Sequence, residues 1–285
     1  MYRIGILGTE NSHAAAFADI VNTPGSIYEN EFKVVALYAH EKAPSEAIAA
    51  KHPDSGIIIC ESIDQMLPLV DCVMVTARDG KYHKDLALPF IRAGKPAFID
   101  KPFTTDVGEA QTLVAEAAAL NVPISGGSGC KYSPEILKLK EEIEKGEIGD
   151  VTSAMVTFAV DLDSPYSGLW FYSSHLVEEM CTLFGYNVRS VMSFKSGKHL
   201  MAVARYDNFD VVMNFENTYT AVVYGTNGWK AVKTTCDGIY EAEFAHFAEM
   251  VKTGKSPMTA EQHIVPVRII AAVKRSLETG REEMI

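Results

Sequence analysis

The sequence lacks an apolar run of the roughly 18 residues that a membrane-spanning helix requires. It also lacks a basic surplus, because 26 Lys and Arg stand against 37 Asp and Glu and give a formal net charge of −11. Binding to nucleic acid or to an anionic membrane requires clustered cations, and no such cluster is present. We therefore expect a small-molecule substrate, with neither nucleic acid nor a membrane as partner.

Paired cysteines and metal-binding motifs are lacking as well. The five cysteines are odd in number and none forms a C-x-x-C pair, which argues against a disulfide framework and a thiolate zinc site. The histidines show no H-x-x-x-H or H-E-x-x-H spacing, so we predict no metal. No G-x-S-x-G elbow or Cys–His pair indicates a hydrolase. Because Met1 leads directly into an apolar run without the regions of a secretory signal, we expect a cytoplasmic protein.

The first half of the chain alternates short apolar runs with helical segments. Apolar residues make up 47% and charged residues 22% of the 285 residues, which is typical of globular chains of about two domains. The alternation predicts an α/β domain over residues 1–125 with a doubly wound parallel sheet, which binds ligands beyond the carboxyl ends of its strands. The expected strands are Tyr2–Leu7, Phe32–Tyr38, Gly56–Cys60, Cys72–Thr76, Ala97–Asp100 and Val122–Ser125, and a long helix is expected at Val107–Leu120.

The second half, residues 126–285, is predicted to form an α+β domain with a largely antiparallel open sheet. A glycine cluster near Ser125–Lys131 marks the boundary. We expect the exposed face of this sheet to be buried in a homodimer or higher homo-oligomer, and the last helix can pack back on the first domain. Strands are expected at Val151–Val160, Arg189–Phe194, Leu200–Tyr206, Val211–Phe215, Ala221–Tyr224 and Trp229–Thr234, and helices at Pro134–Gly146, Ser174–Phe184, Glu241–Lys252 and Glu261–Thr279.

The turn after the first expected strand keeps one glycine of the dinucleotide fingerprint G-x-G-x-x-G. The turn reads Gly8-Thr9-Glu10-Asn11-Ser12-His13, so a carboxylate stands at the second glycine position and would repel a diphosphate. Three alternatives follow: Glu10 points away, the cofactor lies in a shifted position, or the site is weak. Asn11, Ser12 and His13 could donate to an anion at the start of a helix that Ser12 can cap.

The end of the second strand lacks the acid that usually binds the ribose hydroxyl of NAD. Ala39 and His40 occupy this position, and no acid follows until Glu41. His40 and Lys42 could meet a 2′-phosphate, which favours NADP over NAD; the other interpretation is a solvated loop.

Several segments together resemble the Gfo/Idh/MocA family of NAD(P)-dependent oxidoreductases. This resemblance implies an N-terminal Rossmann domain that binds NADP or NAD, and hydride transfer between the nicotinamide and a hydroxyl or carbonyl of a sugar, polyol or related small molecule. The segments are Met1–Gly8, His83 before a helix that ends in Ala93-Gly94-Lys95, Asp100-Lys101-Pro102, Lys140-Glu141 through Gly146–Val151, and Glu261–Arg281.

The resemblance also implies a catalytic lysine and a catalytic histidine. Lys101, at the end of the fifth strand, would donate to the substrate oxygen, and His175 would be the acid/base. Family members carry an Asp four residues before this histidine, whereas this chain has Phe171. Glu179, one turn later, could substitute as the group that orients the ring, and Tyr172 could take part in proton transfer.

Further positions complete the expected site. Cofactor contacts are expected from Gly8, Thr9, Glu10, Asn11, Ser12, His13, His40, Thr76, Asp79, His83, Asp100 and Lys101, and substrate contacts from Lys131, Tyr132, Asp161 and Asp163. The alternative is a catalytically degenerate ligand-binding or sensor protein of the same fold, which the departures at Glu10, Ala39 and Phe171 favour. A lyase or hydrolase that acts on a sugar is a third hypothesis without a positive signal. Retention of both Lys101 and His175 favours the enzyme.

Overall fold

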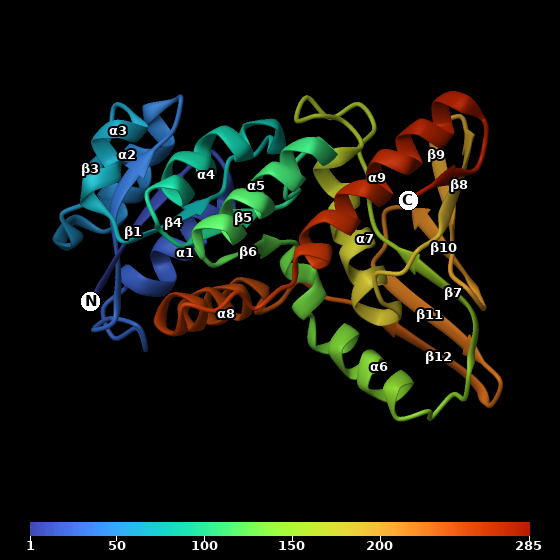
Figure 1. Ribbon diagram of the computed structural model, residues 1–285. Coiled ribbons are helices and arrows are strands. Elements are labelled where there is room, and N and C mark those ends of the chain that lie inside the picture. Colours follow the sequence, from blue (N-terminus) through green and yellow to red (C-terminus); the bar gives the residue numbers. More distant parts are fainter. The chain divides into compact units, whose positions relative to one another are not determined.

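The computed structural model describes residues 1–285 and divides them into two compact units (Figure 1). The first unit comprises Met1–Thr104, Gly108–Gly127 and Tyr240–Thr259. The second unit comprises Thr105–Val107, Ser128–Ile239 and Ala260–Ile285. Residues 240–259 thus belong to the first unit although they lie in the second half of the sequence, and the expected boundaries did not include this exchange.

The first unit contains a six-stranded sheet in the order β3-β2-β1-β4-β5-β6, with every neighbouring pair parallel. The chain changes direction across the sheet between β1 and β4, which is the order of a doubly wound Rossmann sheet. The predicted α/β fold class is therefore confirmed. The strands are β1 Tyr2–Leu7, β2 Phe32–Tyr38, β3 Ile58–Ile59, β4 Cys72–Val75, β5 Ala97–Asp100 and β6 Ile124–Gly127.

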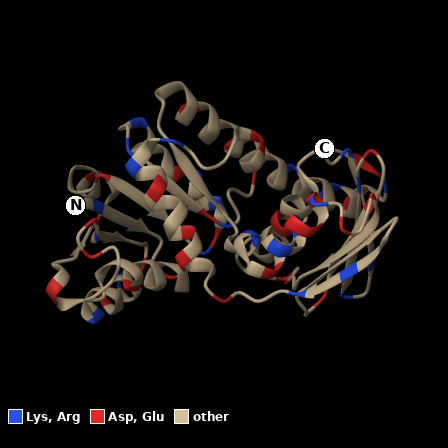
Figure 2. Ribbon diagram, turned by 90° about the horizontal axis from the view of Figure 1, so that it is seen from below, with Lys and Arg blue, Asp and Glu red and all other residues tan.

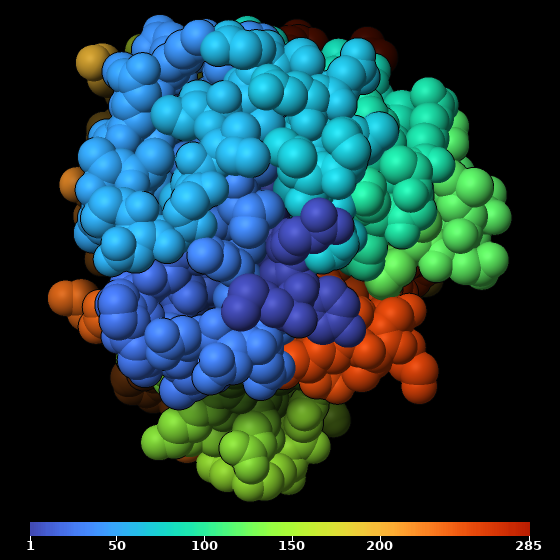
Figure 3. Space-filling model, turned by 90° about the vertical axis from the view of Figure 1, so that its left-hand side faces the viewer, coloured from blue at the N-terminus to red at the C-terminus, as the bar shows by residue number.

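Helices pack on this sheet through an aromatic core. Phe17 and Phe98 meet at 5.3 Å between ring centroids, and two phenylalanines of α8 (Ile239–Thr253) extend the cluster. Phe244 lies 5.6 Å from Phe32, and Phe247 lies 6.4 Å from Phe98. Figure 3 shows α8 in orange beside the dark blue N-terminal segment. The other helices are α1 Ser12–Asn22, α2 Lys42–Lys51, α3 Ile63–Met66, α4 His83–Arg92 and α5 Val107–Leu120.

The second unit contains a seven-stranded sheet in the order β12-β11-β7-β10-β9-β8-β13. All neighbours are antiparallel except β7 and β10, which are parallel, so the predicted largely antiparallel sheet is confirmed with one parallel pair. The short β13 was not expected. The strands are β7 Val151–Thr157, β8 Ser190–Ser196, β9 His199–Arg205, β10 Asp210–Phe215, β11 Thr220–Gly225, β12 Gly228–Lys233 and β13 Glu283–Met284.

Helices pack against this sheet, and alternate strand residues are buried. The helices are α6 Pro134–Glu144, α7 Trp170–Phe184 and α9 Ala260–Thr279, and α9 contacts β8 and α7. The side chains between these buried residues lie on the opposite face of the sheet. Five of them, one from each of five adjacent strands, are paired in register and form a row across the sheet, and each is only partly buried. This outer row comprises Met192, Val203, Val212, Met155 and Val222.

Acidic and basic side chains are interspersed along the chain, as Figure 2 shows. Many of them form surface ion pairs, for example Arg92 with Glu116 at 2.6 Å and Lys145 with Glu141 at 2.5 Å. None of the helices combines the length and the apolar composition needed to span a membrane.

Candidate active site

The turn after β1 requires glycine at position 8. Gly8 has a φ of +85°, and a Cβ there would lie 2.2 Å from the Cα of Ala77. The hydroxyl of Thr76 donates to the Gly8 carbonyl at 2.8 Å, and the Gly8 N–H donates to the carbonyl of Tyr38 at 2.8 Å. These bonds hold the carboxyl ends of β1, β2 and β4 together at the edge where doubly wound sheets bind their ligands.

The carboxylate of Glu10 has a partner within the chain. Its Oε1 accepts from the backbone N–H of Arg78 at 3.0 Å, and the Arg78 guanidinium binds the Glu10 carbonyl. The first of the three alternatives is thus the one that the geometry favours, because the charge is held at Arg78. The start of α1 carries neither an acid in its first turn nor a side-chain cap at Asn11. Gly8 and this uncapped helix start suit a diphosphate, and these residues therefore fit a dinucleotide.

A buried carboxylate ties the end of β5 to the start of α1. Asp100 is fully buried, with its Oδ2 2.7 Å from Nδ1 of His13 and 3.4 Å from Nδ2 of Asn11. Burial alone would raise the pKa of Asp100, but attraction by His13 and Lys101 outweighs burial and holds this pKa below its ordinary value. The side chains of Asn11 and His13, which we expected as donors to an anion, are therefore engaged with Asp100, whereas Ser12 is exposed. Ser12 is also not the cap of α1, because Asn11 takes the N-cap position.

Lys101 follows Asp100 directly at the carboxyl end of β5. Its backbone N–H donates to Oδ1 of Asp100 at 2.7 Å, its side chain is buried, and its peptide bond to Pro102 is cis. Asp100 thus fixes the backbone from which the lysine side chain extends. Lys101 thus lies at the carboxyl edge of the sheet, after the strand that neighbours β4, and β4 with β1 forms the switch point.

The expected residues after β4 hold the loop that follows this strand. His83 is fully buried with Nε2 2.8 Å from the carbonyl of Ala77. Asp79 accepts from the backbone N–H of Lys81 at 3.2 Å and pairs with its Nζ at 2.9 Å. In the turn after β1, Thr9 shares a hydrogen bond of 2.8 Å with Ser45. Each of these side chains positions backbone near Gly8.

The residues at the end of β2 lie at the surface. His40 is exposed, with its ring centroid 6.2 Å from that of Tyr38 and 5.3 Å from that of Tyr82. Lys42 pairs with Glu61 at 2.5 Å, which offsets part of the charge that we assigned to a 2′-phosphate.

In the second unit, α7 presents His175, and the preceding connection holds its ring. Nδ1 of His175 lies 2.7 Å from the hydroxyl of Ser128 and 3.3 Å from Sγ of Cys130. The ring stacks on Phe158 at 4.9 Å, and Tyr172 lies 5.6 Å away. Ser128 thus takes the place of the missing carboxylate as the group that orients the ring. No sequence motif indicates Ser128, because it lies 47 positions before the histidine.

Glu179 lies in an environment that favours its neutral form. Its Oε2 has no hydrogen-bond partner, and burial, reinforced by Cys236 and Glu135, raises the pKa of Glu179 to about 9. A carboxyl group with this pKa is mostly protonated at pH 7, so these observations do not support the expectation that Glu179 substitutes for the family's Asp. Phe171 packs between the rings of Tyr166 at 5.1 Å and Tyr172 at 4.7 Å.

Glu178 instead joins Lys131 and Ser128. Its Oε2 lies 3.0 Å from Nζ of Lys131, and its Oε1 accepts from the Ser128 backbone N–H at 2.7 Å. Burial would lower the pKa of Lys131, but Glu178 outweighs it and raises this pKa above its ordinary value. Nζ of Lys131 also lies 5.3 Å from the ring of Tyr132. The ion pair therefore supports the backbone that positions the His175 partner.

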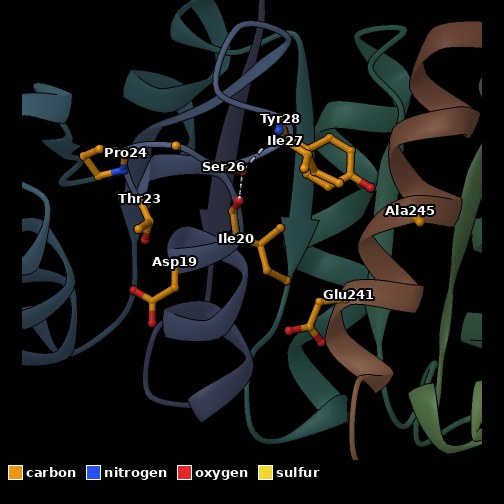
Figure 4. A pocket seen from close by; sticks show the side chains of 10 residues that line it. Asp19, Ile20, Thr23, Pro24, Ser26, Ile27, Tyr28, Glu241 and Ala245 are labelled. Carbon is orange, nitrogen blue, oxygen red and sulfur yellow. Dashed lines mark hydrogen bonds between the residues drawn. The ribbon is translucent and has the colours of Figure 1, made fainter.

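Two other cavities lie apart from these groups. Asp161 and Asp163 are exposed and line a surface cavity of about 160 Å³ with Lys195 and Lys198. A larger cavity of about 650 Å³ lies where α1 ends, at the amino edge of the first sheet. Figure 4 shows Ile20, Tyr28 and Glu241 around it. Because dinucleotides bind at the carboxyl edge of such sheets, this larger cavity is not the cofactor site.

The fold and the site define a class of protein. A doubly wound parallel sheet with a glycine turn after its first strand is the architecture of a dinucleotide-binding Rossmann domain. Residues 2–128 match the family GFO_IDH_MocA, described as an oxidoreductase family with an NAD-binding Rossmann fold. The match covers slightly less than half of the chain, and this part of the chain is therefore similar to the Gfo/Idh/MocA oxidoreductase family.

Similar proteins include dehydrogenases from fungi and bacteria. The chain is 27% identical to dehydrogenase aclE of Aspergillus oryzae, over 56% of this chain and 44% of the relative. It is 30% identical to an inositol 2-dehydrogenase of Rhodococcus erythropolis, over 52% of this chain and 41% of the relative. The matches thus span less than half of the length of these two relatives. Over the whole chain, the fold is similar to that of a myo-inositol dehydrogenase from Lactobacillus casei, solved with NAD(H) and myo-inositol, with a TM-score of 0.84, 18% identity and 97% of that chain covered.

Proposed function

We propose that the protein transfers a hydride between the nicotinamide of NADP or NAD and the CH–OH or carbonyl carbon of a sugar, polyol or related small molecule. The observation that carries this proposal is the orientation of the His175 ring, whose Nδ1 lies 2.7 Å from the hydroxyl of Ser128. The same chain buries Lys101 at the end of β5. The similar inositol dehydrogenases support the substrate class.

In this proposal each unit has its own task. The first unit binds the dinucleotide, which when bound accepts or supplies the hydride. Lys101 donates a hydrogen bond to the substrate oxygen and stabilises its developing negative charge. His175 takes the hydroxyl proton during oxidation and returns it during reduction, with Tyr172 adjacent. The second unit supplies His175 and the predicted substrate contacts, and the free cysteines suit a cytoplasmic location.

The second candidate function is ligand binding or sensing without turnover. Phe171 favours it, because an aromatic ring stands where a carboxylate would stabilise the charged form of the histidine. Incubation with NAD or NADP and a panel of inositols, hexoses and sugar alcohols discriminates the two functions. Reduced nicotinamide appears at 340 nm if the protein is an enzyme, whereas a sensor binds the nucleotide and produces none.

We expect NADPH to bind more tightly than NADH, by a small factor. His40 lies exposed at the end of β2, where no acid can bind the ribose hydroxyls, and Lys42 adds a cation that Glu61 partly offsets. Enhancement of nicotinamide fluorescence on titration measures the dissociation constants of NADPH and NADH. His40→Ala should bring these two dissociation constants closer together, whereas the control His199→Ala should leave them unchanged. Equal or tighter binding of NADH contradicts the preference, and failure of both nucleotides to bind at millimolar concentration contradicts the proposed function.

We also propose that the outer row of the second sheet is buried between two copies of the chain. Phe194, Tyr224 and Trp229 extend this apolar face and are 47%, 47% and 64% exposed. A face of this kind is costly to leave in water, and pairing of identical faces is the simplest way to cover it.

Replacing Val212 by Asp is expected to break this assembly, because it puts a charge at the centre of the outer row. Light scattering should give a multiple of 31.2 kDa for the wild type and about one chain mass for the variant. Leu137→Asp is the control, since Leu137 is an exposed apolar residue of α6 outside the sheet. A wild-type mass near 31.2 kDa at micromolar concentration contradicts the proposal.

A further inference from the structure

Two thiols that the proposed chemistry does not use lie beside His175. Sγ of Cys130 is 3.8 Å from Sγ of Cys236 and 3.3 Å from Nδ1 of His175, although the two cysteines are 106 positions apart. Cys130 is buried in the short 3-10 turn Gly129–Tyr132, and Cys236 is exposed in the irregular segment after β12. The pair therefore consists of one accessible sulfur and one protected sulfur in contact.

We propose that Cys130 and Cys236 form a redox-modification site, which hydroperoxides convert into a reversible intramolecular disulfide. A disulfide requires a sulfur separation of about 2.05 Å, so the two sulfur atoms must approach by somewhat less than 2 Å. Cys236 lies two residues beyond Thr234, whose N–H donates to the Tyr219 carbonyl at 3.0 Å, and its segment continues into Gly238, where a Cβ would meet nothing within 4 Å. The exposed partner can therefore move while the buried partner stays in place.

The two thiols differ in the way that such a reaction requires. The hydrogen bond between the two sulfur atoms lowers the pKa of Cys236 to about 7, whereas the same hydrogen bond and burial raise the pKa of Cys130 far above its ordinary value. Cys236 is thus partly thiolate at neutral pH and reacts first, and Cys130 remains protonated until it is needed. The same property argues against Cys130 and His175 as a hydrolase pair, because Cys130 itself is a poor nucleophile.

The reaction has two steps. The Cys236 thiolate attacks one oxygen of hydrogen peroxide, the S–O bond forms as the O–O bond breaks, and the departing hydroxide takes a proton to become water. Cys130 then loses its proton to Nδ1 of His175 and attacks the sulfur of Cys236, which forms the S–S bond and breaks the S–O bond. The second hydroxide leaves as water after it takes up a proton. Two thiols are oxidised by two electrons in total, and one peroxide is reduced to two waters.

Disulfide formation would change the surroundings of the proposed acid/base. Once its sulfur is bonded to Cys236, Cys130 has no thiol proton left to share with Nδ1 of His175, whereas the hydroxyl of Ser128 remains a partner of this nitrogen. The chain passes from the first unit to the second at Gly127–Ser128 and back at Ile239–Tyr240, so the disulfide also links two of the connecting segments. We therefore expect oxidised protein to turn over more slowly, and this consequence, unlike the disulfide itself, rests on the proposed function.

The test uses the full-length wild-type protein and hydrogen peroxide added in small molar excess. Titration with Ellman's reagent, after the oxidised protein is unfolded in guanidinium chloride to expose the buried thiols, should show the free thiols fall from five to three, and intact mass should fall by two hydrogen atoms. Peptide mapping without reductant should recover the peptides of Cys130 and Cys236 joined, and dithiothreitol should restore both thiols. These readouts do not depend on activity, so they remain valid if the proposed function fails.

Matched variants assign the bond. Cys236→Ser should abolish the mass loss, and Cys60→Ala, which removes a buried thiol of the first unit, should leave it unchanged. Cys130→Ala should instead leave Cys236 with added oxygen. If this variant does not fold, the peptide map of the wild type and the Cys236→Ser variant decide whether these two cysteines form the disulfide. Oxygen added to Cys236 of the wild type without cross-linking, a disulfide with another cysteine, or a covalent dimer through Cys236 overturns the proposal.

Discussion

Replacing His175 by Ala is expected to lower turnover roughly 10²-fold, the low end of the range of about 10²–10⁴ for loss of a general acid/base. The low end applies because Ser128 is a neutral partner and does not stabilise the charged imidazole as a carboxylate would. The pH dependence of turnover should flatten, because the titrating group is removed. Turnover of the most active alcohol in the substrate panel, measured between pH 5 and 9, checks both effects.

A surface histidine of the same unit provides the control for this substitution. His199 is exposed and pairs with Glu216 at 2.6 Å, so His199→Ala should leave rate and pH profile unchanged. Ser128→Ala tests the positioning role, and it should shift the pH profile while leaving nucleotide affinity unchanged. Full turnover by folded His175→Ala protein contradicts the assignment and makes Tyr172 the next candidate.

Replacing Lys101 by Met is expected to lower turnover about 10²–10³-fold, because the variant keeps the apolar stem and loses the donor that stabilises charge in the transition state. KM should change less than kcat, since this interaction strengthens as the hydride leaves the carbon. Stopped-assay kinetics give the two constants, and fluorescence titration should show that nucleotide binding survives.

An exposed lysine serves as the matched control. Lys51 lies on α2 and pairs with Asp19, so Lys51→Met removes the same charge from the surface and should leave kcat unchanged. A folded Lys101→Met protein with wild-type kcat would show that the lysine acts on neither the substrate nor the transition state.

Much of the secondary structure could be predicted, because apolar periodicity is a local property. Phe32–Tyr38, Ala97–Asp100 and Val107–Leu120 have the bounds that the sequence indicates. The sequence of a strand or helix does not indicate which other element it pairs with or packs against. Both β7 and β10 contain three consecutive apolar residues, yet nothing in either segment indicates that the two strands pair in parallel. The apolar face of α8 likewise indicates burial but not against which sheet.

The site shows the same division between local and long-range information. Gly8 and Lys101 were found because each belongs to a short motif at the end of a strand. The partners that orient the expected groups come from elsewhere: Arg78 lies 68 positions from Glu10, and Ser128 lies 47 positions from His175. The contact between Cys130 and Cys236 spans 106 positions, and no C-x-x-C motif indicates it.

Because α8 returns to the first unit, the first unit cannot complete its folding until most of the chain has been synthesised. The rings of Phe32 and Phe98 are made early, but Phe244 and Phe247, which complete their packing, leave the ribosome only after nearly the whole second unit. Until then the nascent Rossmann sheet presents an uncovered aromatic face, which is the kind of surface that chaperones bind. A gene fragment that stops after Gly127 would therefore encode every strand of the sheet and still yield aggregated protein.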